Sequence, residues 1–256
     1  MTNRPGDRRL LLRVAYDGRP FAGWQSQRRA ETVQDRLETA LAGVAGRAIR
    51  VHGAGRTDAG VHALAQVAHC DVPASLRMTP VQWTAALNSK LPASIRVLGC
   101  RRVPDGFHAR YNARGKVYRY EIFRGPVLPP LKAGLAWQVR GGLDIGRLRE
   151  GADLFQGRHD FRNFAANRGK GTPPPRTTER TLREVRVLAH GNRVAVTLSG
   201  DGFLYKMARL ITGTLARFAQ DKLTTRDLLD YLECRSQGKS AFCAPPDGLY
   251  LVRVEY

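Results

Sequence analysis

The sequence predicts an α+β protein in which strands, hairpins and helices are interleaved along the chain. Strand-like apolar runs occur in both halves, and apolar residues at helical spacing recur between them without a regular strand–helix alternation. A strict βαβ series would instead predict a parallel sheet. With 256 residues, the chain is long enough to bury a core, as one large domain or as two small ones.

The first half, residues 1–105, is predicted to combine short strands with helices. Thr32 is suited to cap a helix through residue 45, where apolar side chains recur every three or four positions. Thr79 and Pro80 open a second helix through residue 88, because proline is favoured in a first helical turn. The predicted strands are residues 10–16, 49–52, 66–72 and 95–103.

The second half, residues 106–256, again mixes strands and helices. A hairpin is expected around Gly191, where residues 182–188 and 193–198 have strand-like patterns on either side of a turn sequence. No residue pattern repeats between the two halves, so a duplicated architecture cannot be derived from the sequence itself. The other predicted strands are residues 117–123 and 249–254, and the predicted helices are residues 144–155, 203–219 and 227–233.

Charge is the strongest compositional feature of the chain. Lys and Arg total 42 against 22 Asp and Glu, which gives a formal net charge of +20. Seven of the basic residues are lysine and the other 35 are arginine, a side chain that clamps phosphate and stacks on bases. A GC-rich genome would explain the preference for arginine over lysine, but it would not explain the shortage of acids. The charge therefore favours a nucleic-acid partner.

Several protein classes fit the composition poorly. No apolar run approaches the roughly 20 residues needed to cross a bilayer, and the polar N-terminus does not resemble a signal peptide. We therefore expect a cytoplasmic protein without a membrane partner. The four cysteines are scattered, and no histidine pair has metal-ligand spacing, so neither a disulfide nor a metal site is predicted.

Residues 53–63 form a stretch rich in glycine and alanine that leaves the backbone accessible to a large ligand. Arg56 and Asp58 are two positions apart and can point into one cleft, where an ionised carboxylate suits a nucleophile or an electrostatic catalyst. The spacing matches neither a dinucleotide-binding loop nor a P-loop. From these residues alone, a tight turn in which Asp58 bonds its own backbone is an equally good interpretation.

The segment from Gly55 to His62 resembles the signature of the tRNA pseudouridine synthase A family. Further blocks resemble the same family and occur in the family's order from about residue 10 to the C-terminus. They are residues 16–18, 21–25, 32–34, Asn88 with 91–92, 107–110, 118–120, 160–161, 203–209 and 248–251.

The resemblance implies the α+β pseudouridine synthase fold. Two similar subdomains with antiparallel sheets would join into one extended sheet, with helices on the outer faces and a central catalytic cleft. Residues 1–105 would carry the catalytic Asp loop, and residues 106–256 would complete the cleft and the RNA-binding surface. Family members act as homodimers that isomerise uridine to pseudouridine at positions 38, 39 and 40 in the anticodon arm of tRNA, and they need no cofactor or metal.

The resemblance also implies site residues. Asp58 would be the catalytic carboxylate, with Arg56 holding it ionised and oriented. Three routes stay open for Asp58: attack at C1′, attack at C6, or abstraction of the 2′ proton. Tyr118 would stack on the flipped uracil, although without the family match it would be interpreted as an ordinary strand tyrosine.

Two more residues are candidates for substrate binding. Arg209 lies in an apolar helical stretch, where a buried charge needs a partner such as Asp58; otherwise it lies on the solvent face of the helix. By resemblance, Leu249 lines the uracil pocket, and as a strand residue it can equally belong to the core. His62 is expected to order the turn or contact phosphate, and Trp24 to pack beneath the loop or touch RNA.

Two other functional classes remain as alternatives. A catalytically silent RNA-binding protein would use the same basic surface, but it would have no use for a carboxylate facing phosphates. A small-molecule enzyme with an Asp nucleophile would show no affinity for tRNA and little salt dependence, whereas tRNA binding depends steeply on salt. The basic, proline-rich residues 168–176 are interpreted either as an RNA-clamping loop or as a variable surface insertion.

Overall fold

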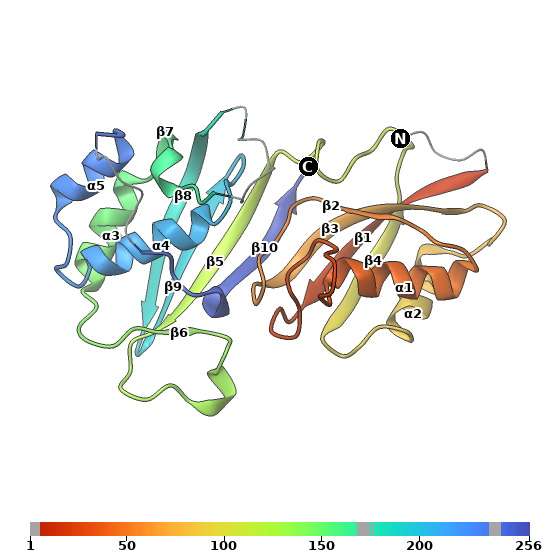
Figure 1. Cartoon of the computed structure of the whole chain (residues 1–256), viewed down its shortest axis with the longest axis horizontal. Helices are drawn as coiled ribbons and strands as arrows, with labels where there is room; N and C mark the ends of the chain where they lie inside the picture. The colour runs from red at the N-terminus through yellow and green to blue at the C-terminus, as the bar shows by residue number, and fades with distance from the viewer. Residues whose placement is uncertain (1–5, 168–174, 176, 236–241) are drawn as a thin grey trace. The chain divides into compact units, whose positions relative to one another are not determined.

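The computed structural model describes residues 6–167, 175, 177–235 and 242–256, which form two compact units (Figure 1). The first unit runs to Arg114 and includes Tyr250–Tyr256, whereas the second comprises Gly115–Leu249. The sequence suggests a break near residue 106, with the C-terminus in the second half. The units divide differently because the last strand pairs within the first unit.

Strands of the first unit pair in the order β4 (Ile95–Arg102), β1 (Asp7–Tyr16), β3 (His62–Pro73) and β10 (Leu249–Glu255). β1 is antiparallel to both of its neighbours, β10 is parallel to β3, and β2 (Val51–Gly53) is antiparallel to β3. β1 lies between β4 and β3, and its apolar side chains are buried in the core of this unit. Its side chains Leu10, Leu12 and Val14 are at most 2% exposed.

Local sequence signals determine where the helices of this unit begin. Thr32 caps α1 (Val33–Ala45) by accepting a hydrogen bond from the Asp35 backbone, and Thr79 forms a capping box with Gln82 at the start of α2 (Pro80–Asn88). The two helices contact each other, and α2 packs on β4 (Figure 1). Their inward side chains complete the core of the first unit; they include Leu37, Leu41, Trp83 and Leu87.

The second unit has an antiparallel sheet in the order β5 (Gly115–Phe123), β9 (Arg193–Gly200), β8 (Glu179–His190) and β7 (Gly157–Asp160). The short strand β6 (Trp137–Gln138) lies parallel to the end of β5. The predicted hairpin is confirmed: β8 and β9 are joined at Gly191, which has a positive φ of 55°.

Helices α3 (Ile145–Leu154), α4 (Met207–Phe218) and α5 (Thr225–Leu232) gather beside the strands of the second unit (Figure 1). α3 contacts α4, α5 and β8, so it lies at the centre of this group. Gly151 of α3 permits the close approach, because an added Cβ would lie 2.8 Å from the ring of Phe218. Short 3₁₀ turns complete the described chain at Pro130–Lys132, Arg162–Phe164 and Pro246–Gly248.

The predicted α+β class is confirmed, and the two predicted boundaries that differ most from the structure are wrong by four residues each. The helix expected from residue 203 begins at Met207, because Lys206 has a left-handed φ of 61° and ends the preceding loop. The strand expected from residue 66 begins at His62, because the residues before 66 pair with neighbouring strands. The proposed basic loop at 168–176 lies outside the described residues except for Pro175. Within the described parts of the chain, no helix is long and apolar enough to span a membrane.

Candidate active site

Asp58 lies in a loop of the first unit, residues 54–61, that connects β2 to β3 and is called the Asp58 loop below. Asp58 is half-buried, its neighbour Thr57 is buried, and Arg56 is exposed. The backbone N–H of Val61 donates to the Asp58 carbonyl at 3.2 Å, so a turn forms directly after the carboxylate. A tight turn therefore follows Asp58, and the interpretation in which the carboxylate bonds its own backbone stays a prediction.

The segment after β1 supports this loop through backbone contacts. The Trp24 N–H donates to the Thr57 carbonyl at 3.1 Å, and the Gly60 N–H donates to the Phe21 carbonyl at 3.4 Å. Phe21 and Trp24 are 4% and 2% exposed, so they form an apolar support for the loop. These contacts connect residues 21–25 to the Asp58 loop; both segments belong to the blocks that resemble the same family in the sequence.

Glycines allow the two segments to approach so closely. An added Cβ at Gly18 would lie 2.2 Å from the Val61 carbonyl oxygen. Gly23 has a φ of +100°, and its added Cβ would lie 2.5 Å from the Thr57 carbonyl oxygen. Both clashes are with backbone atoms, which cannot rotate away, so any larger residue would displace the loop that carries Asp58.

Buried side-chain hydrogen bonds fix the loop from below. The Tyr16 hydroxyl lies 2.8 Å from Thr57 Oγ1, and the Gln66 amide Nε2 donates to the Gly55 carbonyl at 2.9 Å. Burial raises the pKa of Tyr16 well above its ordinary value, so its hydroxyl stays protonated. The sequence gives no sign of this network, because Tyr16 and Thr57 are 41 positions apart.

His62 joins the end of the loop to the turn after β1. Its Nδ1 accepts a hydrogen bond from the Gly18 N–H at 3.1 Å and lies 3.3 Å from Asp17 Oδ1. Its ring stacks on Tyr250 with 4.7 Å between centroids. The side chain is 2% exposed, and these contacts give it a role in ordering the turn.

Trp24 packs beneath the start of the loop. An added Cβ at Gly53 would lie 2.5 Å from the indole ring, so the ring covers the backbone where β2 ends. With 2% of Trp24 exposed, the tryptophan supports the loop.

Tyr118 lies on β5 in the second unit, opposite Leu198 of β9. It is 7% exposed, and the ring of Phe203 packs edge-on against it with 4.8 Å between centroids. The described contacts therefore hold the tyrosine ring in one orientation. Phe203 belongs to the family-like block at residues 203–209, and the sequence does not predict its position beside Tyr118.

The segment between Phe203 and α4 is an ordered loop with one unusual backbone conformation. Lys206 has a φ of 61°, a left-handed value that is uncommon for a residue with a side chain. The Tyr205 carbonyl accepts a hydrogen bond from the Ala166 N–H at 3.0 Å. This bond connects the loop to the segment after the 3₁₀ turn at Arg162–Phe164.

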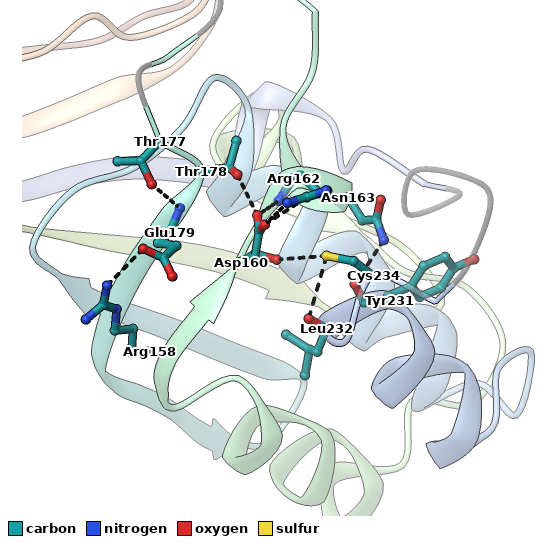
Figure 2. A network of polar contacts seen from close by, with 10 residues as sticks. All are labelled: Arg158, Asp160, Arg162, Asn163, Thr177, Thr178, Glu179, Tyr231, Leu232 and Cys234. Atoms are coloured by element: carbon teal, nitrogen blue, oxygen red, sulfur yellow. Dashed lines mark hydrogen bonds and ion pairs between the residues drawn. The ribbon is translucent and has the colours of Figure 1, made fainter.

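A polar network in the second unit holds that 3₁₀ turn in place (Figure 2). The Asp160 carboxylate pairs with the Arg162 guanidinium and accepts a hydrogen bond from the Thr178 hydroxyl at 2.5 Å. Burial acts to raise the pKa of Asp160, but the hydrogen bonds from Arg162 and Thr178 hold it below its usual range. The Asn163 amide donates to the Tyr231 carbonyl at 3.0 Å, and the Cys234 thiol lies 3.6 Å from the Asp160 carbonyl, so the end of α5 is tied to the same turn.

Arg209 lies on α4 and is half-buried, so it is not simply on a solvent face. Its Nε–H donates to the Ala244 carbonyl at 2.7 Å, and the Ala244 N–H donates to the Arg209 carbonyl at 3.2 Å. The cation is also close enough to Tyr120 to oppose the effect of burial, which raises the pKa of that phenol. The expected pairing of Arg209 with Asp58 stays a prediction.

Leu249 begins β10 directly after the 3₁₀ turn at Pro246–Gly248 and is 5% exposed. Gly248 places this turn against β5, because an added Cβ would lie 2.4 Å from the Glu121 carbonyl oxygen and 2.6 Å from the Tyr120 ring. Leu249 is therefore a buried strand residue, and its part in a uracil pocket stays a prediction. The structure brings Arg56 and Asp58 together in the first unit, and it places Tyr118, Arg209 and Leu249 in the second.

Metal-ligand geometry is not found in the described residues, where no group of three or more His, Cys, Asp or Glu side chains could hold a metal ion.

Comparison with known proteins identifies the family. The family model described as tRNA pseudouridine synthase matches residues 13–112 and 152–256. The chain is 48% identical over 251 residues to a tRNA pseudouridine synthase A of Akkermansia muciniphila, covering 97% of this chain and 95% of that protein. It is 40% identical over 249 residues to a tRNA pseudouridine synthase A of Rhodopseudomonas palustris, covering 97% of this chain and 99% of that protein.

The chain therefore belongs to the tRNA pseudouridine synthase family, and it is an enzyme of the isomerase class. Both the resemblance seen in the sequence motifs and the expected α+β fold are confirmed. Among solved structures, a chain in the crystal structure of a Cbf5–Nop10–Gar1 complex matches 94% of this chain and 48% of its own length. The TM-score of 0.37 and the 13% identity are too low to bear on function.

Proposed function

We propose that this enzyme isomerises uridine to pseudouridine at positions 38, 39 and 40 in the anticodon stem-loop of tRNA, with Asp58 as the catalytic carboxylate. The observation that carries the proposal is the Asp58 loop: a half-buried carboxylate on a loop whose backbone is held by Trp24 and Phe21. Relatives named tRNA pseudouridine synthase A support tRNA as the substrate. The net charge of +20 supports binding to a polyanion.

The reaction breaks the N1–C1′ bond, turns the uracil, joins C5 to C1′ and releases the C5 proton to solvent, while N1 takes up a proton, so the product is an isomer of the substrate. No electrons are gained or lost, so the chemistry needs a carboxylate and a proton acceptor. Asp58 can act by attack at C1′, by attack at C6 or by removing the 2′ proton. Asp58 is half-buried and follows the buried Thr57, and this geometry favours none of the three routes over the others.

The target uracil must leave its stack to reach Asp58, which costs a few kcal/mol. In the proposal, Tyr118 stacks on the flipped base, and this stacking offsets roughly 1–3 kcal/mol of the unstacking free energy. The edge-on packing of Phe203 supports this role, because it fixes the tyrosine ring before the base arrives. In the proposal, the Tyr118 hydroxyl relays the C5 proton: its oxygen takes the proton from C5 as it gives its own proton to solvent.

Arg56, Arg209 and Leu249 complete the proposed site. Arg56 is exposed next to Asp58, where it would orient the carboxylate or hold a phosphate of the target nucleotide. Arg209 would contribute a cation whose position is fixed by the Ala244 carbonyl, and Leu249 would contribute an apolar wall. The proposal further includes a homodimer in the cytoplasm, with tRNA contacting both subunits.

The test uses an unmodified tRNA transcript labelled with tritium at uracil C5. Wild-type enzyme, without added cofactor, is expected to release tritium to water, and Asp58→Asn is expected to release none. Asp58→Ala should bind tRNA within about tenfold of the wild type, a change of roughly 1.4 kcal/mol. Asp153→Asn, an exposed carboxylate on α3, is the matched control and should keep full activity.

Two results would contradict the proposal. If neither enzyme releases tritium but both bind tRNA tightly, the chain acts on RNA by binding alone. If Asp58→Ala loses most of its affinity for tRNA, Asp58 has a structural role. Transcripts with uridine replaced at positions 38, 39 and 40 then assign the released tritium to a site, and light scattering of the enzyme–tRNA complex determines the number of subunits.

A further inference from the structure

Tyr111 is an exposed aromatic residue in the turn between β4 and β5, which the catalytic proposal does not use. It is 77% exposed, although single exposed apolar side chains are common and need no explanation by themselves. Three features distinguish Tyr111 from such residues: its turn is anchored to the core, its ring rests on another ring, and its surroundings are basic. The inference below rests on the proposed function in one respect, namely that tRNA is the ligand.

The backbone around Tyr111 is anchored from the core of the first unit. The Ala109 N–H donates to Nδ1 of the buried His69 at 3.1 Å, and the Tyr256 hydroxyl donates to the Ala109 carbonyl at 2.7 Å. The Arg9 guanidinium, which is paired with Asp71, donates to the Phe107 carbonyl at 2.8 Å. The turn therefore has fixed partners on β1, on β3 and at the C-terminus.

His108 shapes the turn that carries Tyr111. Its ring Nδ1 accepts hydrogen bonds from the Arg110 and Tyr111 backbone N–H groups at 3.1 and 3.3 Å, and the His108 backbone N–H donates to Asn112 Oδ1 at 2.6 Å. A ring nitrogen that accepts carries no proton, so the imidazole is neutral in this arrangement. Burial, followed by neighbouring His52 and Arg9, lowers the pKa of His108, in agreement with the geometry.

The Tyr111 ring lies on a column of imidazoles. It stacks on His108 with 4.2 Å between centroids and 29° between planes. His108 meets His69 edge-on at 4.6 Å, and His69 stacks on His52 at 5.0 Å. This support restrains the tyrosine ring while most of its surface stays in solvent, so little side-chain entropy is lost when a base stacks on it.

The surroundings of Tyr111 favour a polyanion. The Arg110 guanidinium lies 5.9 Å from the ring centroid, and Arg114 is exposed three residues after Tyr111. Burial raises the pKa of the Tyr256 hydroxyl that holds the turn, and the positive charge of Arg101, which is exposed on β4, acts to lower it. Asp105 is the acidic residue of the same segment, and its backbone carbonyl is bound by Arg9. The segment that carries Tyr111, residues 101–114, therefore contains four arginines and one acidic residue.

We propose that Tyr111 is a base-stacking platform for tRNA, on which an unpaired base rests while Arg110 contacts the adjacent phosphate. An aromatic face accepts any base, and a guanidinium beside it neutralises the backbone that follows. The platform belongs to the first unit alone and is separate from the Asp58 loop. It contributes to holding the tRNA, and it takes no part in bond breaking.

The test compares Tyr111→Ala, Tyr111→Phe and Val81→Ala. Val81 lies on α2 of the same unit and is also 77% exposed, so its truncation is a matched control for loss of an exposed apolar side chain. Affinity for a fluorescently labelled, unmodified tRNA transcript is measured by anisotropy over a range of salt concentrations. Tyr111→Ala should weaken binding by about 5- to 100-fold, while Tyr111→Phe and Val81→Ala should stay within about twofold of the wild type.

The salt dependence identifies the kind of contact. Tyr111→Ala should leave the slope of log Kd against log salt unchanged, because stacking releases no counterions, whereas Arg110→Gln should reduce it by about 0.7 to 0.9. The platform is rejected if Tyr111→Ala binds as tightly as Val81→Ala, if Tyr111→Phe is as weak as Tyr111→Ala, or if Tyr111→Ala lowers the slope. Thermal melts of all variants show whether any loss of binding reflects unfolding.

The platform and the proposed isomerase activity fail in different ways. Tritium release at saturating wild-type enzyme tests the reaction and does not depend on Tyr111. If the wild type releases no tritium but Tyr111→Ala still weakens tRNA binding, the platform stands and the proposed reaction does not. If the wild type is active and Tyr111→Ala binds normally, the reaction stands and the platform is rejected.

Discussion

Acid is expected to destabilise the first unit through His69, and His69→Gln should reveal how much. His69 is 2% exposed, and its Nδ1 accepts a hydrogen bond from the Ala109 N–H at 3.1 Å. Burial, then the neighbouring His108, His52 and Arg9, lowers its pKa from 6.5 to about 4, with Asp71 acting in the opposite direction. The folded protein therefore resists protonation of this ring.

The sign and size of the effect follow from the two pKa values. Above pH 6.5 neither the folded nor the unfolded state holds the proton, so His69 has no pH-dependent effect on stability. Between pH 6.5 and about 4 only the unfolded chain takes up the proton, so the free energy of unfolding falls as the pH falls. The loss is about 2 kcal/mol at pH 5 and about 3 kcal/mol at pH 4, below which it levels off.

Urea denaturation between pH 7.5 and pH 4.5 measures this loss. Fluorescence of Trp24 and Trp83, both buried in the first unit, reports its unfolding. Glutamine keeps an acceptor for the Ala109 N–H but does not titrate. His69→Gln loses the ring contacts with His52 and His108, so it should be less stable than the wild type at pH 7, and the gap should narrow by about 2 kcal/mol by pH 5.

The control is His190→Gln, which removes an exposed histidine at the turn between β8 and β9 and should leave the pH dependence of unfolding unchanged. His52 and His108 also have lowered pKa values, chiefly through burial, so His69→Gln should keep part of the acid sensitivity. If His69→Gln and the wild type lose stability in parallel from pH 7 to pH 5, the ring is not held neutral by the fold.

Substitutions around Asp58 and at Tyr118 test how the reacting groups are positioned. Gly18→Ala should unfold the first unit more easily by about 1–3 kcal/mol and slow tritium release, whereas Gly99→Ala, with open space at its Cβ, should do neither. Tyr16→Phe should cost about 1–3 kcal/mol in urea denaturation, because buried Thr57 loses its hydroxyl partner. Tyr118→Phe should slow single-turnover tritium release while tRNA affinity by anisotropy stays within about twofold, and an unchanged rate would exclude a proton transfer through its hydroxyl.

Local signals made much of the fold predictable. Thr32 and Thr79 cap helices through hydrogen bonds to residues three positions away, so their sequence context contains all that the cap requires. Contacts between distant segments account for the wrong boundaries. β3 begins at His62 because Tyr250, far along the chain, pairs beside it, and no pattern within residues 62–66 contains that information.

The candidate site was predictable in its motifs and unpredictable in its supports. Asp58 was identified from a loop of small residues and from a family resemblance, both of which are properties of a continuous segment. The groups that hold the loop, Tyr16 and Gln66, come from different strands, and their hydrogen bonds depend on the sheet register. Phe203 was missed as a neighbour of Tyr118 for the same reason.

The arginine excess should not be equated with the number of phosphate contacts. Arg9 is 8% exposed, and its guanidinium donates hydrogen bonds to Asp71 and to two backbone carbonyls. It therefore stabilises the first unit and cannot reach RNA. Arg158 and Arg162 are engaged by Glu179 and Asp160 within the second unit (Figure 2). Each phosphate contact contributes about 0.7 to 0.9 to the salt slope of tRNA binding. The measured slope should therefore correspond to far fewer phosphates than the net charge of +20, and a slope near that charge would mean that the ion pairs of the free protein open when tRNA binds.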